Sequence, residues 1–127
     1  MEKYQLRYWI EWGGAYWLWE NDDRTSKEIG YGPINDDIPM PDKLRQRGDA
    51  LANWYQDSMN WGDPRICPIW KQEECDRFRK EVRAFFQDLV AAIGDKYEIV
   101  YQQDEPDEHP LLDEYFKDPN AFDVRRW

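Results

Sequence analysis

Residues 4–19 have the sequence YQLRYWIEWGGAYWLW, in which two β-rich runs flank a glycine pair. In the first run, apolar or aromatic residues occupy every second position from Tyr4 to Trp12, as in a strand with one buried face. Gly13 and Gly14 can supply the positive φ angles that a tight turn between antiparallel strands requires. The stretch therefore predicts an N-terminal β-hairpin.

Residues 42–60 predict a first helix. Leu44, Leu51 and Trp54 share one stripe at helical spacing. Gly48 lies on the same stripe, where a glycine weakens the helix but lets another element approach closely.

A second helix is predicted from Glu73 to Ile93. Its apolar residues recur at i, i+3 and i+4 and form a wide stripe, and its first turn is acidic, which suits a helix N-terminus. Gly94 suits the helix end. Residues 96–103 then alternate like a strand.

The predicted order is β-β-α-α-β followed by an acidic C-terminal segment. Residues 21–41 are rich in Gly, Pro, Asn and Asp and predict a loop, with a possible short strand at 27–31. We expect an α+β fold in which a small, mostly antiparallel sheet packs against two helices. The expected domain is 1–103, and residues 104–127 are expected to dock on it or on a partner.

The charge balance limits the classes of partner. Seventeen Lys and Arg face 27 Asp and Glu, which gives a net charge of −10. This charge repels nucleic-acid backbones and anionic membranes, so we expect neither as a partner. No long apolar segment occurs, and Cys67 and Cys75 lack a CxxC spacing. We expect a cytoplasmic protein with reduced thiols, although a disulfide between the two is possible.

The sequence offers little for catalysis. The one histidine, His109, lies in the acidic segment, and no nucleophile-elbow sequence surrounds Ser26 or Ser58. We expect no metal and no cofactor. A hydrolase that uses a pair of carboxylates stays open, because acidic pairs such as Asp22-Asp23 are frequent.

Partner binding is better supported, and two groups of candidate residues carry it. The first group joins polar and aromatic residues near the end of the first helix to acidic residues of the C-terminal segment. Its members are Tyr55, Asp57, Asn60, Trp61, Asp104, Glu105, Asp107 and Glu108.

The second candidate is an aromatic patch on the hairpin. Trp9, Tyr16 and Leu18 are expected to share the face opposite Tyr8, Ile10 and Trp17. If the helices cover only that opposite face, the exposed aromatic residues on the first face mark an interaction site. The alternative is that aromatic residues of the C-terminal segment cover this face: Phe116, Phe122 and Trp127.

Three short stretches carry a resemblance to known sequences: WIEWG…WLW at 9–19, WY..S.NW at 54–61 and W..EEC.RF at 70–78. They resemble a family of small bacterial proteins without an assigned activity, over most of residues 4–103. More loosely, the small acidic chain resembles the immunity proteins of polymorphic-toxin and contact-dependent inhibition systems.

The second resemblance implies inhibition of a cognate bacterial toxin by a monomeric binding protein that covers the toxin's active site, and the acidic charge leads us to expect a basic toxin. One alternative is an acidic nucleic-acid mimic that inhibits another enzyme, with carboxylates spaced like phosphates on one face. The other alternative is the carboxylate-dependent hydrolase.

Overall fold

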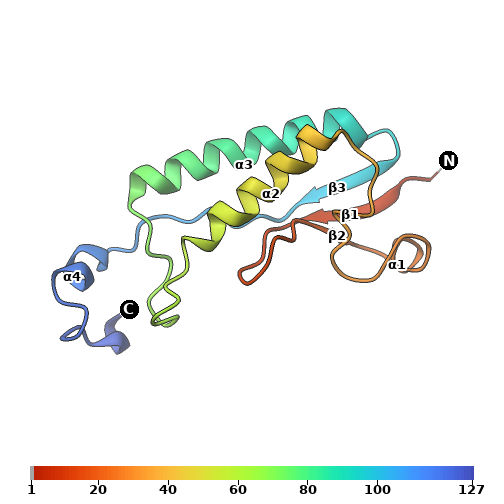
Figure 1. Cartoon of the computed structure of the whole chain (residues 1–127). Coiled ribbons are helices and arrows are strands. Elements are labelled where there is room, and N and C mark those ends of the chain that lie inside the picture. The colour runs from red at the N-terminus through yellow and green to blue at the C-terminus, as the bar shows by residue number, and fades with distance from the viewer. Residues whose placement is uncertain (1) are drawn as a thin grey trace.

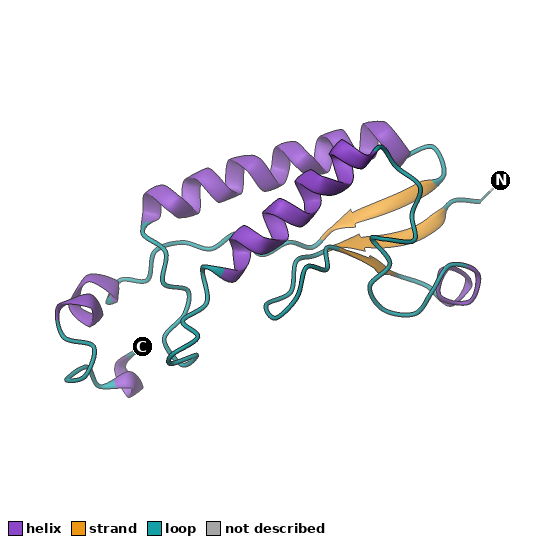
Figure 2. Cartoon of the chain, in the orientation of Figure 1, coloured by secondary structure: helices purple, strands orange, loops and turns teal. Residues whose placement is uncertain are grey.

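The computed structural model describes residues 2–127 (Figure 1). Helices α2 and α3 lie side by side over one face of a small sheet, and α4 and the C-terminus lie beyond the far end of these helices (Figures 1 and 2). The elements are β1 (Tyr4–Tyr8), β2 (Leu18–Glu20), α1 (Asp23–Glu28), α2 (Asp42–Gln56), α3 (Gln72–Ile93), β3 (Tyr97–Tyr101), α4 (Leu112–Lys117) and a 3-10 helix (Val124–Arg126).

The three strands form one sheet with the order β2-β1-β3. Strand β1 pairs with β2 in antiparallel fashion, with Tyr8 opposite Leu18, and with β3 in parallel, with Tyr8 opposite Tyr101. The predicted α+β class is confirmed, but the sheet is mixed rather than mostly antiparallel. The reason is that the helices between β1 and β3 form a crossover, and a crossover returns the chain parallel to the first strand.

The predicted hairpin is confirmed as a strand pair, but its turn is longer than the glycine pair. Residues 9–17 connect the two strands, and Gly13 alone in this loop has a positive φ, of 103°. The side chain of Gln56 donates to the backbone oxygens of Glu11 and Gly14 and accepts from the Gly13 N–H. Helix α2 therefore fixes the tip of this loop, whose base is closed by a hydrogen bond from the Trp9 N–H to the Trp17 carbonyl at 3.2 Å.

The possible strand at 27–31 is wrong, because residues 23–28 form helix α1. The carboxylate of Asp22 accepts a hydrogen bond from the Thr25 N–H at 2.8 Å and caps the helix. Thr25 is buried, and its hydroxyl accepts from the Gln5 N–H of β1 at 3.0 Å. The acidic residues that suggested a loop thus begin a helix.

Helix α2 ends four residues before the predicted boundary. The Ser58 hydroxyl donates to the Tyr55 carbonyl at 2.7 Å, and the Ser58 N–H bonds to the same oxygen, which closes the helix in a tight turn. The close approach predicted at Gly48 is confirmed. The Trp17 ring lies so near that a β-carbon at Gly48 would overlap it.

The core lies between the sheet and the two long helices. Phe78, Val82, Phe85 and Leu89 of α3 are fully buried, and the Tyr8 hydroxyl donates to the Val82 carbonyl at 3.1 Å. Burial raises the pKa of Tyr8 far above its ordinary range.

The two cysteines are free, so the possible disulfide does not form in this structure. Cys75 is buried on the core side of α3, and burial raises the pKa of its thiol to about 11. No helix within residues 2–127 combines the length and apolar character needed to cross a membrane.

Candidate aromatic groove and C-terminal clamp

A cavity of about 440 Å³ opens between the first part of the loop after β1, the end of α2 and the segment after β3. We call it the aromatic groove. Its lining residues come from three separate parts of the sequence: Trp9, Ile10, Glu11, Trp12, Tyr55, Met59 and Asp104.

Stacked rings form one wall of the groove. Trp12 stacks on Tyr55 with ring centroids 5.3 Å apart and planes at 8°, and its indole N–H donates to the Ser58 hydroxyl at 2.9 Å. Trp9 packs against Trp19 at 5.2 Å, and the Trp19 indole N–H donates to the Trp9 carbonyl at 2.7 Å. The indoles of Trp12 and Trp19 are therefore held in fixed positions by hydrogen bonds, and the Trp9 ring packs against the second of them.

Two glutamines fix the backbone of the groove. Besides its bonds to residues 11–14, Gln56 donates to the Ala52 carbonyl at 2.9 Å. Gln103 is buried; its side-chain oxygen accepts from the Ile10 N–H at 2.5 Å, and its amide donates to the Asp104 carbonyl at 2.9 Å. Gln103 thus ties the segment that carries Glu11 to the segment that carries Asp104.

The groove carries negative charge. The carboxylates of Glu11 and Asp104 are exposed, and neither has an ion-pair partner or a hydrogen-bond donor within the described part of the chain. Helix α2 ends at Gln56 beside the groove, where its dipole adds partial negative charge. Burial, followed by the nearby charge of Asp104, raises the pKa of Tyr55. The site therefore combines aromatic faces with free negative charge.

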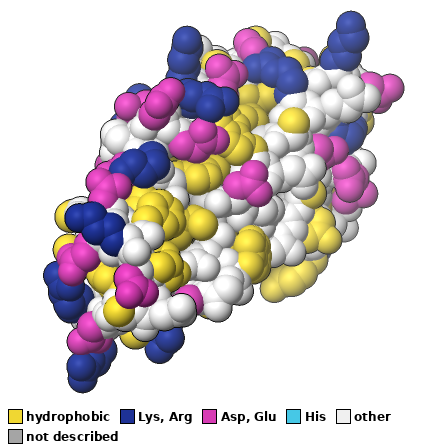
Figure 3. Space-filling view, turned by 60° about the vertical axis from the view of Figure 1, so that its left-hand side comes forward, with side chains coloured by type: hydrophobic (Ala, Val, Ile, Leu, Met, Phe, Trp, Pro, Cys, Tyr) yellow, Lys and Arg dark blue, Asp and Glu magenta, His cyan; other side chains and the backbone are white. Residues whose placement is uncertain are grey.

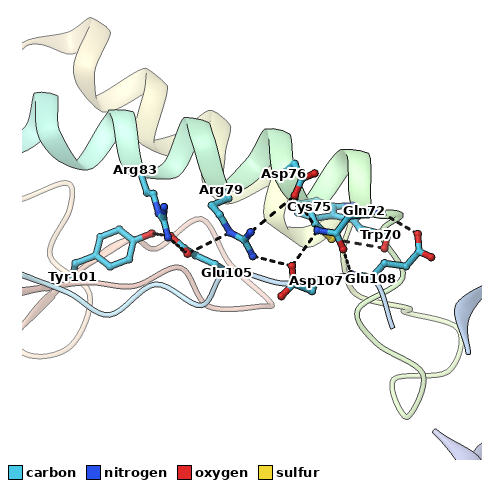
Figure 4. A network of polar contacts seen from close by, with 10 residues as sticks. All are labelled: Trp70, Gln72, Cys75, Asp76, Arg79, Arg83, Tyr101, Glu105, Asp107 and Glu108. Carbon is cyan, nitrogen blue, oxygen red and sulfur yellow. Dashed lines mark hydrogen bonds and ion pairs between the residues drawn. The ribbon is translucent and has the colours of Figure 1, made fainter. Parts of the chain in front are cut away.

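A second cluster joins the C-terminal segment to α3 (Figure 4). We call it the C-terminal clamp; its acidic members are Glu105, Asp107, Glu108 and Asp113, and its basic members are Lys71, Arg79 and Arg83. Glu105 pairs with Arg83 at 2.5 Å and with Arg79 at 3.4 Å. The Arg83 hydrogen bond holds the pKa of Glu105 below its usual range.

The clamp continues along the first turns of α3. Asp107 pairs with Arg79 at 2.9 Å and accepts from the Gln72 side chain at 3.0 Å, and these contacts lower its pKa. Glu108 accepts from the Gln72 N–H and the Gln72 side chain accepts from the Glu108 N–H, both at 3.0 Å. Lys71 pairs with Glu108 and with Asp113.

Aromatic contacts dock the last residues against the loop after α2. The Trp127 indole donates to the Cys67 carbonyl at 3.1 Å and stacks on His109 at 3.5 Å. The Asn60 amide donates to the Tyr115 hydroxyl at 3.0 Å. These contacts place the C-terminal aromatics beside residues 60–67, rather than on the open face of the sheet as the alternative for the hairpin patch requires.

The structure brings some predicted partner-binding residues together and separates others. Tyr55 and Asp104 meet Trp9 in the aromatic groove. The other acidic candidates of the C-terminal segment, Glu105, Asp107 and Glu108, are all engaged in the clamp.

The remaining candidates belong to neither of these two clusters. Asn60 bonds to the C-terminal segment, whereas Asp57 is exposed and Trp61 keeps 59% of its surface accessible.

The residues predicted for the hairpin patch differ in exposure, and Trp9 is half-buried. Tyr16 is 45% exposed and packs edge-on against Trp19. Leu18 is buried, contrary to expectation, because it pairs with Tyr8 across the sheet and so points toward the helices. Trp19 takes the position that was expected for Leu18.

Sequence reasoning missed six residues of the groove and its frame: Ile10, Glu11, Trp12, Gln56, Met59 and Gln103. Glu11 and Trp12 fell within the predicted strand, so their side chains were assigned to strand faces. No sequence signal marks the two glutamines, since their importance depends on backbone groups far away in the chain.

The part of the chain that the structure describes contains no cluster of three or more His, Cys, Asp or Glu side chains placed to hold a metal ion.

Figure 3 shows one side of the molecule, on which hydrophobic side chains form separate patches between acidic and basic side chains.

Comparison with protein families matches residues 4–104 to the family described as Serratia CdiI immunity protein-like. A comparison with curated proteins found no match. The matched range contains every lining residue of the aromatic groove and ends one residue before the first acidic residue of the clamp.

Proposed function

Because the chain belongs to the Serratia CdiI immunity protein-like family, we propose that it binds a cognate bacterial toxin domain and neutralises it by occluding its active site. The single observation that carries this proposal is the family match across both long helices and all three strands. A binding role, rather than a catalytic one, is what this membership supports.

The proposed partner is a basic toxin domain, bound by a monomer. A net charge of −10 would raise the rate of association with a positively charged partner through electrostatic steering. Around the groove, Asp57, Trp61 and Tyr16 are exposed and complete a surface with acidic and aromatic character. Enrichment in aromatic side chains is typical of the energetic centre of interfaces.

The proposed place of action is the cytoplasm. Free thiols at Cys67 and Cys75 fit a reducing compartment, in which a toxin would be met after entry into the cell.

Co-expression with the toxin domain encoded by the adjacent upstream gene tests the proposal. We expect this chain to restore growth of cells that produce the toxin domain, and to co-purify with it at moderate salt. Unchanged toxicity in the presence of well-expressed, folded protein would contradict the proposal.

The nucleic-acid mimic is less well supported than the immunity protein. It requires carboxylates in a continuous array on one face, whereas the face in Figure 3 carries both signs of charge and the clamp neutralises several carboxylates internally.

A further inference from the structure

Resting on the proposed function, we infer that the aromatic groove is the pocket that receives one arginine or lysine side chain from the basic surface of the toxin. The groove joins stacked rings, two free carboxylates and the C-terminal end of α2 in one concave site. Each of these features favours a cation, and no other described site of the molecule combines them.

The rings supply one part of the recognition. A guanidinium or ammonium group within about 6 Å of a ring centroid is attracted by the negative face of the aromatic system. Trp9 and Trp12 line the groove and are partly exposed, whereas Tyr55 is buried and supports the Trp12 ring from behind. Its volume of about 440 Å³ lies within the range of sites that hold small ligands, so a single long side chain fits.

The carboxylates supply the second part. Glu11 and Asp104 line the groove from different segments, and neither is neutralised by a basic side chain within residues 2–127. A guanidinium group bound at either carboxylate would form charge-assisted hydrogen bonds, which are stronger than neutral ones. Arginine fits better than lysine, because its planar group stacks on rings and donates in a fork at the same time.

The groove is also preorganised. Gln103 connects Ile10 to Asp104, Gln56 holds the loop at Glu11, and the Trp12 indole is bonded to Ser58. A side chain that enters this site therefore orders few additional groups, which lowers the entropic cost of binding.

The first test uses a small probe, N-acetyl-L-argininamide, with the uncharged citrulline analogue as its control. We expect saturable NMR shifts of the indole N–H signals of Trp9 and Trp12 with the arginine probe, and no saturable shifts of Trp54 or Trp70. The absence of saturable shifts, or equal shifts with the citrulline analogue, would overturn the inference.

The second test measures the affinity of the full chain for the toxin domain by calorimetry. Glu11→Gln combined with Asp104→Asn removes both groove charges. The matched control combines Glu81→Gln with Asp95→Asn, two exposed residues outside the groove whose carboxylates have no ion-pair partner in the described chain. We expect the groove variant to bind about tenfold or more weakly and the control variant to stay within about twofold of the wild type.

The outcomes separate the inference from the proposed function. Equal weakening in both variants, or in neither, overturns the inference and leaves the immunity function intact. If the wild-type chain neither binds nor inhibits the toxin domain, the proposed function is overturned. The inference that a side chain of the toxin occupies the aromatic groove is then overturned as well. The probe titration then still reports whether the groove binds a guanidinium group.

Discussion

Asp104 and Glu105 are neighbours in sequence and both line a cavity beside Arg83, but only Glu105 pairs with that arginine. Asp104 lines the aromatic groove without an internal partner, whereas Glu105 is paired with Arg83 and Arg79 in the C-terminal clamp. A net charge of −10 counts the two residues equally. The difference shows that the surface open to a basic partner is decided by which carboxylates the fold leaves unpaired.

The two regions are also held by different forces. The groove rests on buried rings and on hydrogen bonds between neutral groups. The clamp consists mainly of ion pairs with partly exposed side chains, for example Arg79–Asp107 with 29% and 65% of their side-chain surfaces accessible. Salt screens the attraction between exposed charges, so it weakens the ion pairs of the clamp. Contacts between buried neutral groups, which hold the groove, are not weakened by this screening.

The largest expected effect is the loss of the ring beneath the groove. Phe78 is fully buried and lies against Tyr55 at 5.2 Å and against Trp54 and Trp70. Phe78→Ala should lower the free energy of unfolding by about 3–5 kcal/mol, as is typical for large aromatic residues in a core. Urea unfolding followed by tryptophan fluorescence measures this change.

The matched control for that change lies in the C-terminal segment. Phe116 is 47% exposed, so Phe116→Ala should alter the free energy of unfolding by no more than about 0.5 kcal/mol. Equal losses at the two positions would contradict the division between a buried core beneath the groove and a peripheral C-terminal segment.

A smaller effect is expected at Gln103. Gln103→Ala leaves the buried Ile10 N–H without its acceptor and should cost about 1–3 kcal/mol of unfolding free energy. Gln102→Ala is the control, because Gln102 is exposed and should change the stability little. Chemical denaturation of both variants checks the pair, and a harmless Gln103→Ala would show that the groove does not depend on this bond.

The elements with regular periodicity could be predicted from the sequence. Helix α3 has a continuous apolar stripe, and β1 alternates strictly, so packing alone specifies them. Helix α1 was missed because Asp22 favours both loops and helix N-termini, and only the bond to Thr25 distinguishes the two. The parallel pairing of β3 depends on the path of the helices, which no local pattern records.

The candidate site was predictable only in part, because its charges are defined by contacts that span the chain. Tyr55 and Asp104 were identified, but their convergence with Trp9 requires the tertiary fold. The pairing of Glu105 with Arg79 and Arg83 had a weak sequence signal, since two basic residues four positions apart share one face of a helix. The sequence does not show, however, which acidic residues of the chain lie against the face of α3 that carries Arg79 and Arg83.

Acid should weaken the clamp through Glu105 and Asp107. Their pKa values are lowered in the folded protein, so the stabilisation is present above the ordinary pKa values of about 4 and is lost as the pH falls through the lowered ones. Unfolding free energies measured by urea titration from neutral pH to about pH 3 should therefore decrease toward low pH.

Glu105→Gln provides the control for this pH dependence. The variant should be less stable than the wild type at neutral pH, and the difference should shrink as Glu105 becomes protonated in the wild type. A difference that stays constant over the whole range would mean that the charge of Glu105 contributes nothing to the stability of the clamp.

The smallest expected effect concerns salt, and it compares two amides directly. The Glu108 N–H donates to Gln72 within the clamp, whereas the Ile10 N–H donates to the buried Gln103 beside the groove. Raising the salt from about 0.1 M to about 1 M shortens the screening length from about 10 Å to about 3 Å, which weakens exposed pairs worth about 0–1 kcal/mol each. Hydrogen exchange followed by NMR should therefore become faster at Glu108 and stay unchanged at Ile10. Equal acceleration at both amides would show that the groove and the clamp open as one cooperative unit, and the groove would then owe its shape to the same ion pairs that hold the C-terminal segment.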